Sequence, residues 1–479
     1  MNRSMVRYLL AKLLLIEAAL LSVPLIVSLI YQEDFKVLLS ILATMGILGL
    51  LGWFGIAFKP KNYHIYTKEG MLIVALCWTL WSFFGALPFV FSGQIPNIID
   101  AFFEVSSGFT TTGATVLPDV AVLSHSLLFW RSFTHLIGGM GVLVFALAIM
   151  ENSKNAHLEV MRAEVPGPIF GKVVSKLKNT AQILYIIYLV MFVIFTAILW
   201  IAGMPFYDSI VTAMGGAGTG GFAVYNDSIA HYHSSLITII VAVGTLLFGI
   251  NFNLYYFLLL RKFKVFFGDE ELRTYLGIVA VATGLIFLNI FNLYGSWAQS
   301  LEYSFFQVSE VITTTGFGIT DLTKWPLFSQ TVLLLLMLIG GSAGSTAGGF
   351  KVMRSLIIAK ISRNQMLKTL YPNRVMALHI NHTPLDKSTQ HSILKYLSVY
   401  MMIFLGLILA LSIDNNNFMV AVSAAASTFN NIGPMLGTAE TFNIFSPWAK
   451  ILMSFAMIAG RLEIYPMLLL FLPKTWSKY

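Results

Sequence analysis

The residues of this sequence that could do chemistry lie in four short turns. All four turns contain glycine, and three of them also contain threonine. They read TTTGAT at 110–115, GTGGFA at 218–223, TTTGFG at 313–318 and NNIGPM at 430–435. Their fourth positions all hold glycine: Gly113, Gly221, Gly316 and Gly433. Glycine permits positive φ, so consecutive carbonyls can point to one side, and threonine hydroxyls add further oxygen atoms. No turn contains Asp or Glu. Such uncharged, oxygen-rich turns suit a monovalent cation that sheds its water and leaves quickly.

The elements before each turn must bring these oxygen atoms together. Every turn follows an apolar, helix-compatible run that is too short to cross a bilayer, because a spanning helix needs about 20 residues. We interpret each run as a re-entrant half-helix that dips into the membrane and returns. Irregular backbone survives at that depth only where protein or a water-filled cavity surrounds it. The four stretches are 97–120, 204–228, 301–326 and 417–440.

The half-helices belong to a fourfold repeat of span, half-helix, glycine turn and span, always in the same orientation. The four glycines are 108, 95 and 117 residues apart, and such a recurring unit indicates a repeat architecture. Parallel copies predict pseudo-fourfold packing about the membrane normal, with rings of carbonyls like those of a potassium pore. The half-helices would point their partly negative C-termini at a dehydrated cation. The alternative is that the turns are ordinary extracellular loops. That interpretation would explain one such turn, but it explains four at matching places less well.

Composition places these elements in a membrane. Of the 479 residues, 57% are hydrophobic and 11% are charged, and the mean hydropathy is +0.78. Long apolar runs recur throughout, which excludes a soluble protein and also a β-barrel, whose strands are about ten residues of weak alternation. We predict an all-α polytopic membrane protein with ten transmembrane spans and four re-entrant pore helices. Two extra N-terminal spans precede four parallel repeats around one pseudo-fourfold pore. The spans are expected near 5–30, 37–58, 70–91, 126–150, 182–202, 235–260, 274–295, 328–360, 392–412 and 447–472.

This topology divides the chain into an N-terminal two-span segment and four pore repeats. Their ranges are 1–69, 70–155, 156–265, 266–365 and 366–479. The formal net charge is +8, and 25 of the 30 Lys and Arg residues fall on one side of the predicted membrane. A basic balance can indicate nucleic-acid binding, but the cytoplasmic excess of Lys and Arg in membrane proteins explains it here. We therefore expect no nucleic-acid partner and both termini in the cytoplasm.

No pattern typical of an enzyme is present in the sequence. It contains no HExxH, no GxSxG with partner residues, no Walker A loop and no clustered carboxylates. The single cysteine, Cys77, lies in an apolar run, where we expect a small core residue. One thiol can form neither an internal disulfide nor a CxxC zinc site. We expect no catalysis and no organic cofactor.

A glycine-rich interruption in the third repeat is a candidate gate. Residues 340–349 read GGSAGSTAGG inside a leucine-rich span, and each glycine weakens a helix by about 1 kcal/mol relative to alanine. We interpret them as an intramembrane loop beneath the turns that blocks or opens the path. A close contact between helices through small residues is the alternative. Only this repeat is expected to break in this way. The residues concerned are Gly340, Gly341, Gly344, Ser345, Thr346, Gly348 and Gly349.

Arg461, inside the last predicted span, is the second gate candidate. A charged residue near mid-bilayer is costly and by default faces the protein interior or an aqueous path. A purely structural pairing with Glu463 or with a nearby carbonyl is the alternative.

Arg131 and His135 are further polar residues within a predicted span. We interpret Arg131 as structural, paired with the pore-helix residue Glu104 or with Glu310. For His135 a polar contact between helices is favoured over proton relay.

Five longer motifs resemble the Trk/Ktr/HKT superfamily of potassium transporters over nearly the whole chain. They are FWRSFTHLIGGMGVLVF at 129–145, GINFNLYY at 249–256, DEELRTYL at 269–276, IGGSAGSTAGGFKVMR at 339–354 and AGRLEIYP at 459–466. The extra N-terminal spans and the length are similar to the bacterial Trk-type pore-forming subunit rather than to the shorter Ktr type.

The resemblance implies channel-like conduction of K⁺ through one selectivity filter, with potassium as the only bound cofactor. It also implies that 340–349 is the gating loop and that Arg461 repels cations below the filter. Serine in place of the first filter glycine is associated with sodium transport in the superfamily, so Gly113 favours potassium. The second and fourth turns depart from the TTTG pattern. The implied filter residues are Thr111, Thr112, Gly113, Thr219, Gly220, Gly221, Thr314, Thr315, Gly316, Asn431, Ile432 and Gly433.

The same resemblance implies partners and a location. It predicts a homodimer in the bacterial plasma (inner) membrane with a cytosolic, nucleotide-binding regulatory subunit similar to TrkA. The sequence itself shows only two basic loops, 151–181 and 361–391, where such a partner could dock. Membrane lipid is the other expected partner.

A symporter with alternating access, coupling K⁺ to Na⁺ or H⁺, is the alternative function. It predicts inverted repeats around a midplane site, whereas these repeats share one orientation. Whether a second ion is coupled stays open. A purely structural membrane subunit would leave the four glycine turns without a role.

Overall fold

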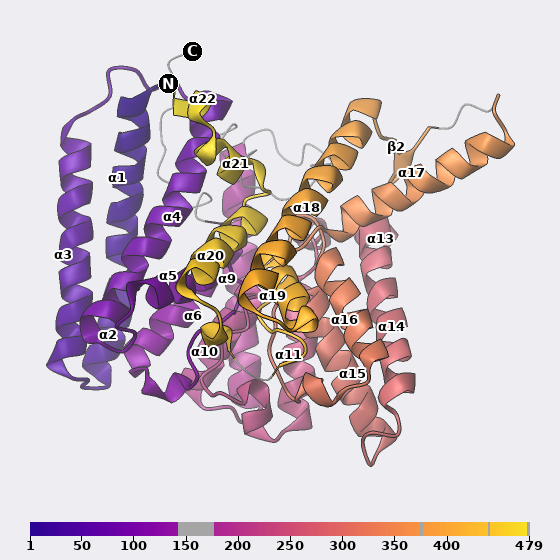
Figure 1. The fold of residues 1–479 in the computed structure, drawn as a ribbon, viewed down its shortest axis with the longest axis horizontal. Helices are drawn as coiled ribbons and strands as arrows, with labels where there is room; N and C mark the ends of the chain where they lie inside the picture. Colours follow the sequence, from indigo (N-terminus) through magenta and orange to yellow (C-terminus); the bar gives the residue numbers. More distant parts are fainter. Residues whose placement is uncertain (142–176, 374–376, 439–440, 477–479) are drawn as a thin grey trace.

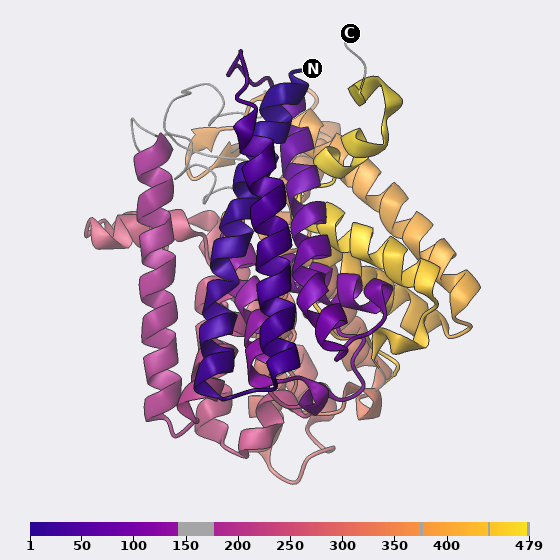
Figure 2. The same cartoon turned by 90° about the vertical axis from the view of Figure 1, so that its left-hand side faces the viewer.

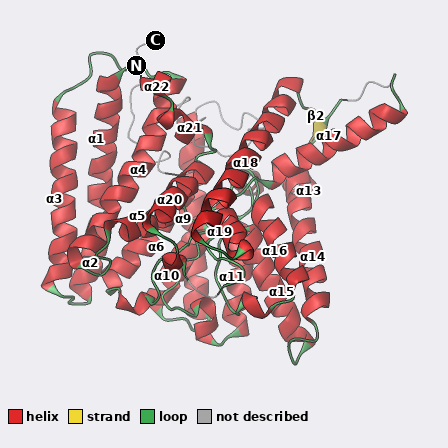
Figure 3. Cartoon of the chain, in the orientation of Figure 1, coloured by secondary structure: helices red, strands yellow, loops and turns green. Residues whose placement is uncertain are grey.

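The protein is almost entirely helical in the part that the structure, a computed structural model, describes: residues 1–141, 177–373, 377–438 and 441–476. Figure 1 shows its two termini at the same end of the molecule, and Figure 3 shows how the loops connect the helices. The sheet is one antiparallel pair, β1 (His379–Ile380) with β2 (Thr383–Pro384). The predicted all-α class is confirmed for the described residues.

The N-terminal segment forms a helical hairpin beside the rest of the molecule. α1 (Arg3–Leu20) continues after one residue into α2 (Ser22–Ile30), and together they make one span. α3 (Phe35–Ala57) then returns along α1, as Figure 2 shows. A Cβ atom on Gly55 would lie 2.4 Å from the Cβ of Ala11. Glycine at this position therefore permits the close helix contact that small residues favour in membranes.

Four units of the same design follow, each with a first helix, a pore helix, a turn that leads into a short 3₁₀ helix, and a second helix. Unit one comprises α4 (Thr67–Ser92), α5 (Ile98–Phe109), η1 (Val120–Val122) and α6 (His125–Gly139). Unit two comprises α9 (Leu177–Ile201), α10 (Phe206–Gly218), η2 (Ser228–Tyr232), α11 (Ser235–Phe248), α12 (Phe252–Leu259) and α13 (Phe263–Gly268). Unit three comprises α14 (Glu270–Ile290), α15 (Trp297–Ile312), η3 (Leu322–Lys324), α16 (Leu327–Ile339) and α17 (Val352–Leu370). Unit four comprises α18 (Lys387–Asp414), α19 (Phe418–Asn430), η4 (Phe442–Ile444), α20 (Pro447–Arg461), α21 (Tyr465–Phe471) and α22 (Pro473–Trp476).

The pore helices α5, α10, α15 and α19 are short for local reasons. They have 12 to 16 residues, which is about 18–24 Å at 1.5 Å per residue and less than the bilayer core. Side chains of Asn97, Ser296 and Asn417 accept backbone N–H groups at three of the four starts, as N-cap residues do. Each helix ends where the backbone turns left-handed, for example at Thr219 and Asn431.

Several second helices are broken within the predicted spans. Six described helices are long and apolar enough to cross a membrane, and the pair α11–α12 makes a seventh if its 90° bend lies within one span. The predicted spans at 235–260, 328–360 and 447–472 are each divided in two. A break restricted to the third repeat is therefore wrong. The far half of the span predicted at 126–150, the boundary at 155 and most of the loop 151–181 lie outside the described residues.

Identifiable residues cause these breaks. The side chain of Asn251 accepts the N–H of Asn253 at 3.0 Å and begins α12 anew. Gly340 has φ of 73°, a left-handed conformation that glycine adopts without strain. Pro466 has no N–H to donate to the carbonyl of Leu462, so the regular helical hydrogen bonding is interrupted at this point.

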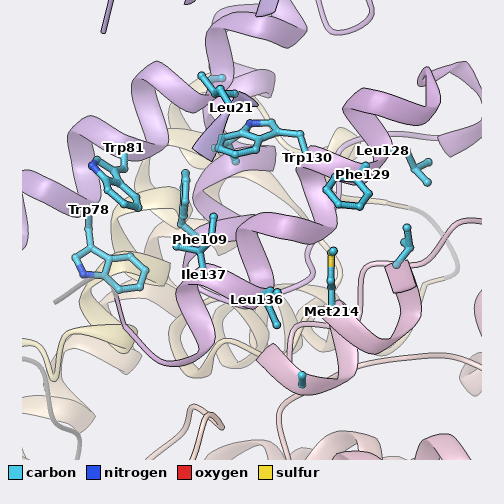
Figure 4. Close-up of a cluster of buried hydrophobic side chains, with 14 of the residues drawn as sticks. Leu21, Trp78, Trp81, Phe109, Leu128, Phe129, Trp130, Leu136, Ile137 and Met214 are labelled. Carbon is cyan, nitrogen blue, oxygen red and sulfur yellow. The ribbon is translucent and has the colours of Figure 1, made fainter. Parts of the chain in front are cut away.

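Aromatic side chains fix the first pore helix between its neighbours (Figure 4). The ring of Phe109 lies 5.4 Å from that of Trp81 on α4 and 6.0 Å from that of Trp130 on α6. The indole N–H of Trp130 donates to the carbonyl of Gly85 at 3.0 Å. Cys77 is buried in the same core, as expected.

The outer surface carries many exposed large hydrophobic residues. Examples from different units are Trp53, Ile201, Leu288, Leu409 and Ile413. Exposed apolar surface of this extent is typical of a face that contacts a membrane.

Candidate functional site

The four Thr/Gly turns share one backbone conformation. The first and third residues of each triplet have positive φ: Thr111 and Gly113 (55° and 79°), Thr219 and Gly221 (56° and 71°), Thr314 and Gly316 (57° and 86°), and Asn431 and Gly433 (58° and 106°). The N–H of each middle residue donates to the carbonyl five residues earlier, at 2.8 to 2.9 Å: Thr112 to Ser107, Gly220 to Gly215, Thr315 to Glu310 and Ile432 to Ser427. Alternating signs of φ let consecutive carbonyls face the same side.

The turns close into a ring. A Cβ atom on Gly113 would lie 1.9 Å from the carbonyl oxygen of Gly220 in the next unit. The same relation joins the remaining turns: Gly221 to Thr315 at 2.1 Å, Gly316 to Ile432 at 2.1 Å and Gly433 back to Thr112 at 2.7 Å. Each glycine therefore faces the middle carbonyl of its neighbour in cyclic order. The structure brings all four predicted turns together around one axis.

A cavity of about 370 Å³ lies directly against this ring. Its wall includes all four turn glycines and side chains from the segments that follow the turns, among them Arg131, Tyr225, Asn226 and Thr441. No Asp or Glu lines it among the described residues. The entrance to the ring is therefore polar without carrying carboxylates.

A buried ion pair supports the end of the first turn. Nε of Arg131 lies 2.6 Å from Oε1 of Glu104. Glu104 also accepts the hydroxyl of Thr115 at 2.9 Å and the N–H of Val116 at 3.0 Å. The guanidinium of Arg131 lies 3.4 Å from the ring centroid of Phe222, beside the second turn. The predicted pairing of Arg131 with Glu104 is confirmed, and this pair connects units one and two.

Glu310 has a different role from the one considered for it. It accepts the hydroxyl of Thr245 at 2.9 Å and the N–H of Phe317 at 3.3 Å. It therefore supports the chain that leaves the third turn, much as Glu104 supports the first.

His135 makes a polar contact between α6 and the first pore helix. Its Nδ1 donates to the carbonyl of Gly108 at 2.8 Å, and its ring centroid lies 4.2 Å from that of Phe222. A Cβ atom on Gly220 would lie 2.3 Å from Nδ1. His135 therefore packs behind the second turn, which is the geometry of the favoured helix contact.

Residues 340–349 form a non-helical loop that packs against the ring. The N–H of Gly348 donates to the hydroxyl of Thr314 at 2.6 Å. The hydroxyl of Thr346 donates to the carbonyl of Phe248 at 3.2 Å. A Cβ atom on Gly348 would lie 2.4 Å from the carbonyl oxygen of Asn430. The loop is thus docked on the third and fourth turns.

Arg461 ties this loop to the first unit. Its Nη1 donates to the carbonyl of Thr346 at 2.6 Å, and its Nη2 donates to the carbonyls of Gly138 and Gly139 at 2.7 and 2.6 Å. Arg461 thus contacts nearby carbonyls, as the structural alternative also expects, and its role as a gate stays a prediction. Glu463, the carboxylate considered for Arg461, forms an ion pair with Arg354.

Four polar contacts were missed from the sequence. Glu271 accepts the N–H groups of Ala343 and Met353 at 2.6 and 3.1 Å and so holds both ends of the loop. The buried ammonium of Lys351 donates to the carbonyl of Ala347. The other two contacts are the ion pairs Arg354–Glu463 and Lys450–Asp100. The available signal was a charged residue within or next to an apolar span.

The fold and the ring together define a polytopic helical membrane transport protein built from four span–pore-helix units. The family model of TrkH, described as a cation transport protein, matches residues 42–478, so the chain belongs to the TrkH family. The resemblance expected from the motifs is thereby confirmed.

Individual relatives cover nearly the whole chain. The Trk system potassium uptake protein TrkH of Salmonella typhimurium is 36% identical over 429 residues, covering 88% of each chain. TrkG of Escherichia coli strain K12 is 31% identical over 465 residues, covering 95% of this chain and 94% of that protein. The crystal structure of the potassium transporter TrkH from Vibrio parahaemolyticus matches with a TM-score of 0.90 at 29% identity, covering 100% of both chains.

Proposed function

We propose that this protein takes up potassium through a channel-like path in which K⁺ passes one selectivity filter formed by the four glycine turns. The closed ring of glycine–carbonyl approaches, from Gly113 to Gly220 and onward to Gly433 and Thr112, carries the proposal. Rings of carbonyls can replace the hydration shell of K⁺. The relatives named above as potassium uptake proteins support the choice of ion.

Neutral oxygen atoms are the proposed ligands. The middle carbonyls of Thr112, Gly220, Thr315 and Ile432 are the ones nearest to the neighbouring glycines. The buried hydroxyl of Thr111 has no hydrogen-bond partner among the described residues, so it can add another oxygen. A neutral site favours a monovalent ion in transit over a tightly held divalent ion.

The loop 340–349 and Arg461 are the proposed gate. Gly348 in the loop donates to the hydroxyl of Thr314, and Arg461 donates to the carbonyl of Thr346 in the same loop. A positive charge at this depth repels a cation strongly, because the surrounding dielectric constant is low. Opening would require the loop to leave Thr314 and Arg461 to release Thr346.

Regulation and orientation extend the proposal. The basic residues on the side of the termini favour a cytoplasmic location for both ends, in the bacterial inner membrane. α17 reaches away from the body of the molecule (Figure 1) and carries the exposed residues Arg363 and Lys368. It offers a docking surface for a cytosolic nucleotide-binding subunit of the TrkA type. We further propose a homodimer and the division into a two-span segment and four pore repeats.

Ion flux in proteoliposomes that contain this chain alone would test the proposal. Passive flux of K⁺ and Rb⁺ that clearly exceeds Na⁺ flux is expected, with protein-free vesicles as the control. Equal Na⁺ and K⁺ fluxes would contradict the filter. Flux that requires an opposing Na⁺ or H⁺ gradient would establish the symporter instead. If every ion is silent, adding the cytosolic partner must restore K⁺ flux for the proposal to stand.

A further inference from the structure

A second cavity, of about 680 Å³, lies far from the ring, between α1, α3, α4 and α22. Its volume is within the range of pockets that bind small molecules. Apolar side chains form most of its wall, including Leu10, Leu14 and Phe84. At the end near the chain termini the lining changes to Arg3, Arg7 and Trp476.

The depth of this cavity matches one leaflet of a bilayer. Arg3, Arg7, Leu10 and Leu14 recur at helical spacing and so lie on one face of α1. From Arg3 to Leu14 the helix rises by about 16 Å. The hydrocarbon core of a bilayer is about 30 Å thick, so the groove extends over about half of it.

The mouth of the groove is positively charged and incompletely paired. Arg3 donates to the carbonyl of Trp476 and Arg7 to the carbonyl of Phe58, both at 3.2 Å. A guanidinium has five N–H donors, so each arginine retains others. Neither arginine forms an ion pair with a carboxylate in the described ranges. Tryptophan is enriched where a membrane protein meets the headgroups.

We propose that this groove binds one membrane phospholipid with an anionic headgroup. Its phosphate would lie between Arg3 and Arg7, and an acyl chain would extend past Leu10 toward Leu14 and Phe84. The charge at the mouth distinguishes this occupant from an apolar helix, which would leave both guanidiniums without an anion. The lipid would bridge the N-terminal hairpin and the C-terminal α22, two segments that lie outside the ring.

Lipid retention by the purified full-length chain would test this. The protein is taken from bilayers of equal phosphatidylcholine and phosphatidylglycerol into mild detergent, and retained lipids are counted by native mass spectrometry. The wild type should retain one phosphatidylglycerol in preference. Arg3→Gln with Arg7→Gln should lower that preference about 30-fold, since each basic side chain near an anionic surface contributes about 1 kcal/mol. Lys262→Gln with Lys264→Gln, two exposed residues at the start of α13, removes the same charge elsewhere and should leave the retention of phosphatidylglycerol unchanged.

A second variant addresses the acyl chain. Leu10→Trp fills the groove without altering its charge and should also abolish retention, with folding checked by thermal unfolding. Equal retention by the wild type and the Arg3/Arg7 variant would overturn the proposal. An equal loss in the Lys262/Lys264 control would reduce it to a general surface-charge effect and overturn it as well. Soluble glycerol phosphate that raises the unfolding temperature as much as phosphatidylglycerol would assign the arginines to a free phosphate instead of a lipid.

Discussion

Gly113 occupies the most crowded point of the ring, and Gly113→Ser should lower the preference for K⁺ over Na⁺. Its φ is 79°, and a residue with a side chain in this region costs about 1–2 kcal/mol. The added Cβ would lie 1.9 Å from the carbonyl oxygen of Gly220, whereas real Cβ contacts essentially never fall below 3.0 Å. That oxygen must therefore move by at least the difference, 1.1 Å. We expect the K⁺/Na⁺ flux ratio to fall at least about tenfold, which corresponds to about 1.4 kcal/mol.

Parallel K⁺ and Na⁺ fluxes in proteoliposomes would measure this ratio. Gly203→Ser is a matched control, because Gly203 also has positive φ, 101°, but has no atom within 4 Å of the position a Cβ would take. The control carries the backbone strain without the contact, so its flux ratio should equal that of the wild type. An unchanged ratio in folded Gly113→Ser protein would refute the filter assignment. A comparable change in the control would show that strain, not carbonyl displacement, is responsible.

Three further substitutions probe the gate and the support of the ring. Arg461→Ala removes a buried charge and its bond to the loop, and should raise K⁺ flux severalfold; unchanged flux would make Arg461 structural. Arg131→Met leaves Glu104 buried without its ion-pair partner and should lower the free energy of unfolding by about 3–5 kcal/mol. Unfolding in micelles would measure this loss. Adding Glu104→Gln should recover most of it, and no recovery would contradict the pairing. Gly348→Ala places a Cβ atom 2.4 Å from a carbonyl oxygen of the fourth unit, so it should detach the loop and raise basal K⁺ flux. Gly406→Ala, with open space around it, is the control and should leave the flux unchanged. Equal flux in both variants would argue against docking of the loop.

The ring was predictable because each of its requirements is local. Positive φ at a turn demands glycine or tolerates a few polar residues, and this requirement recurs at Gly113, Gly221, Gly316 and Gly433. Repetition then identified the turns as one site. The pairing of Arg131 with a pore-helix glutamate was predictable from charge and depth alone, because the membrane leaves few other partners.

The breaks in the second helices were not predictable in the same way. At 340–349 the glycine content signals the break within the sequence. Asn251 and Pro466 mark the other two breaks locally, but one such residue does not predict a break, since Pro88 lies inside the continuous helix α4. Long-range contacts stabilise these places: Ser342 donates to the carbonyl of Gly249 and Phe252 to that of Gly344. Glu463 is paired with Arg354. Such long-range pairs leave no periodic trace in a single sequence.

The closure of the ring has a consequence for how the protein is made. The amide of Asn431 donates to the hydroxyl of Thr112 at 3.0 Å, across 319 residues of chain. A ribosome makes the first turn long before the fourth, so until the fourth turn is made the first three lack their contacts with it. Contacts between distant parts of a chain form late, after their loops have closed. The proposed filter is therefore complete only at the end of biogenesis, and a chain that stops before α19 would lack its fourth turn.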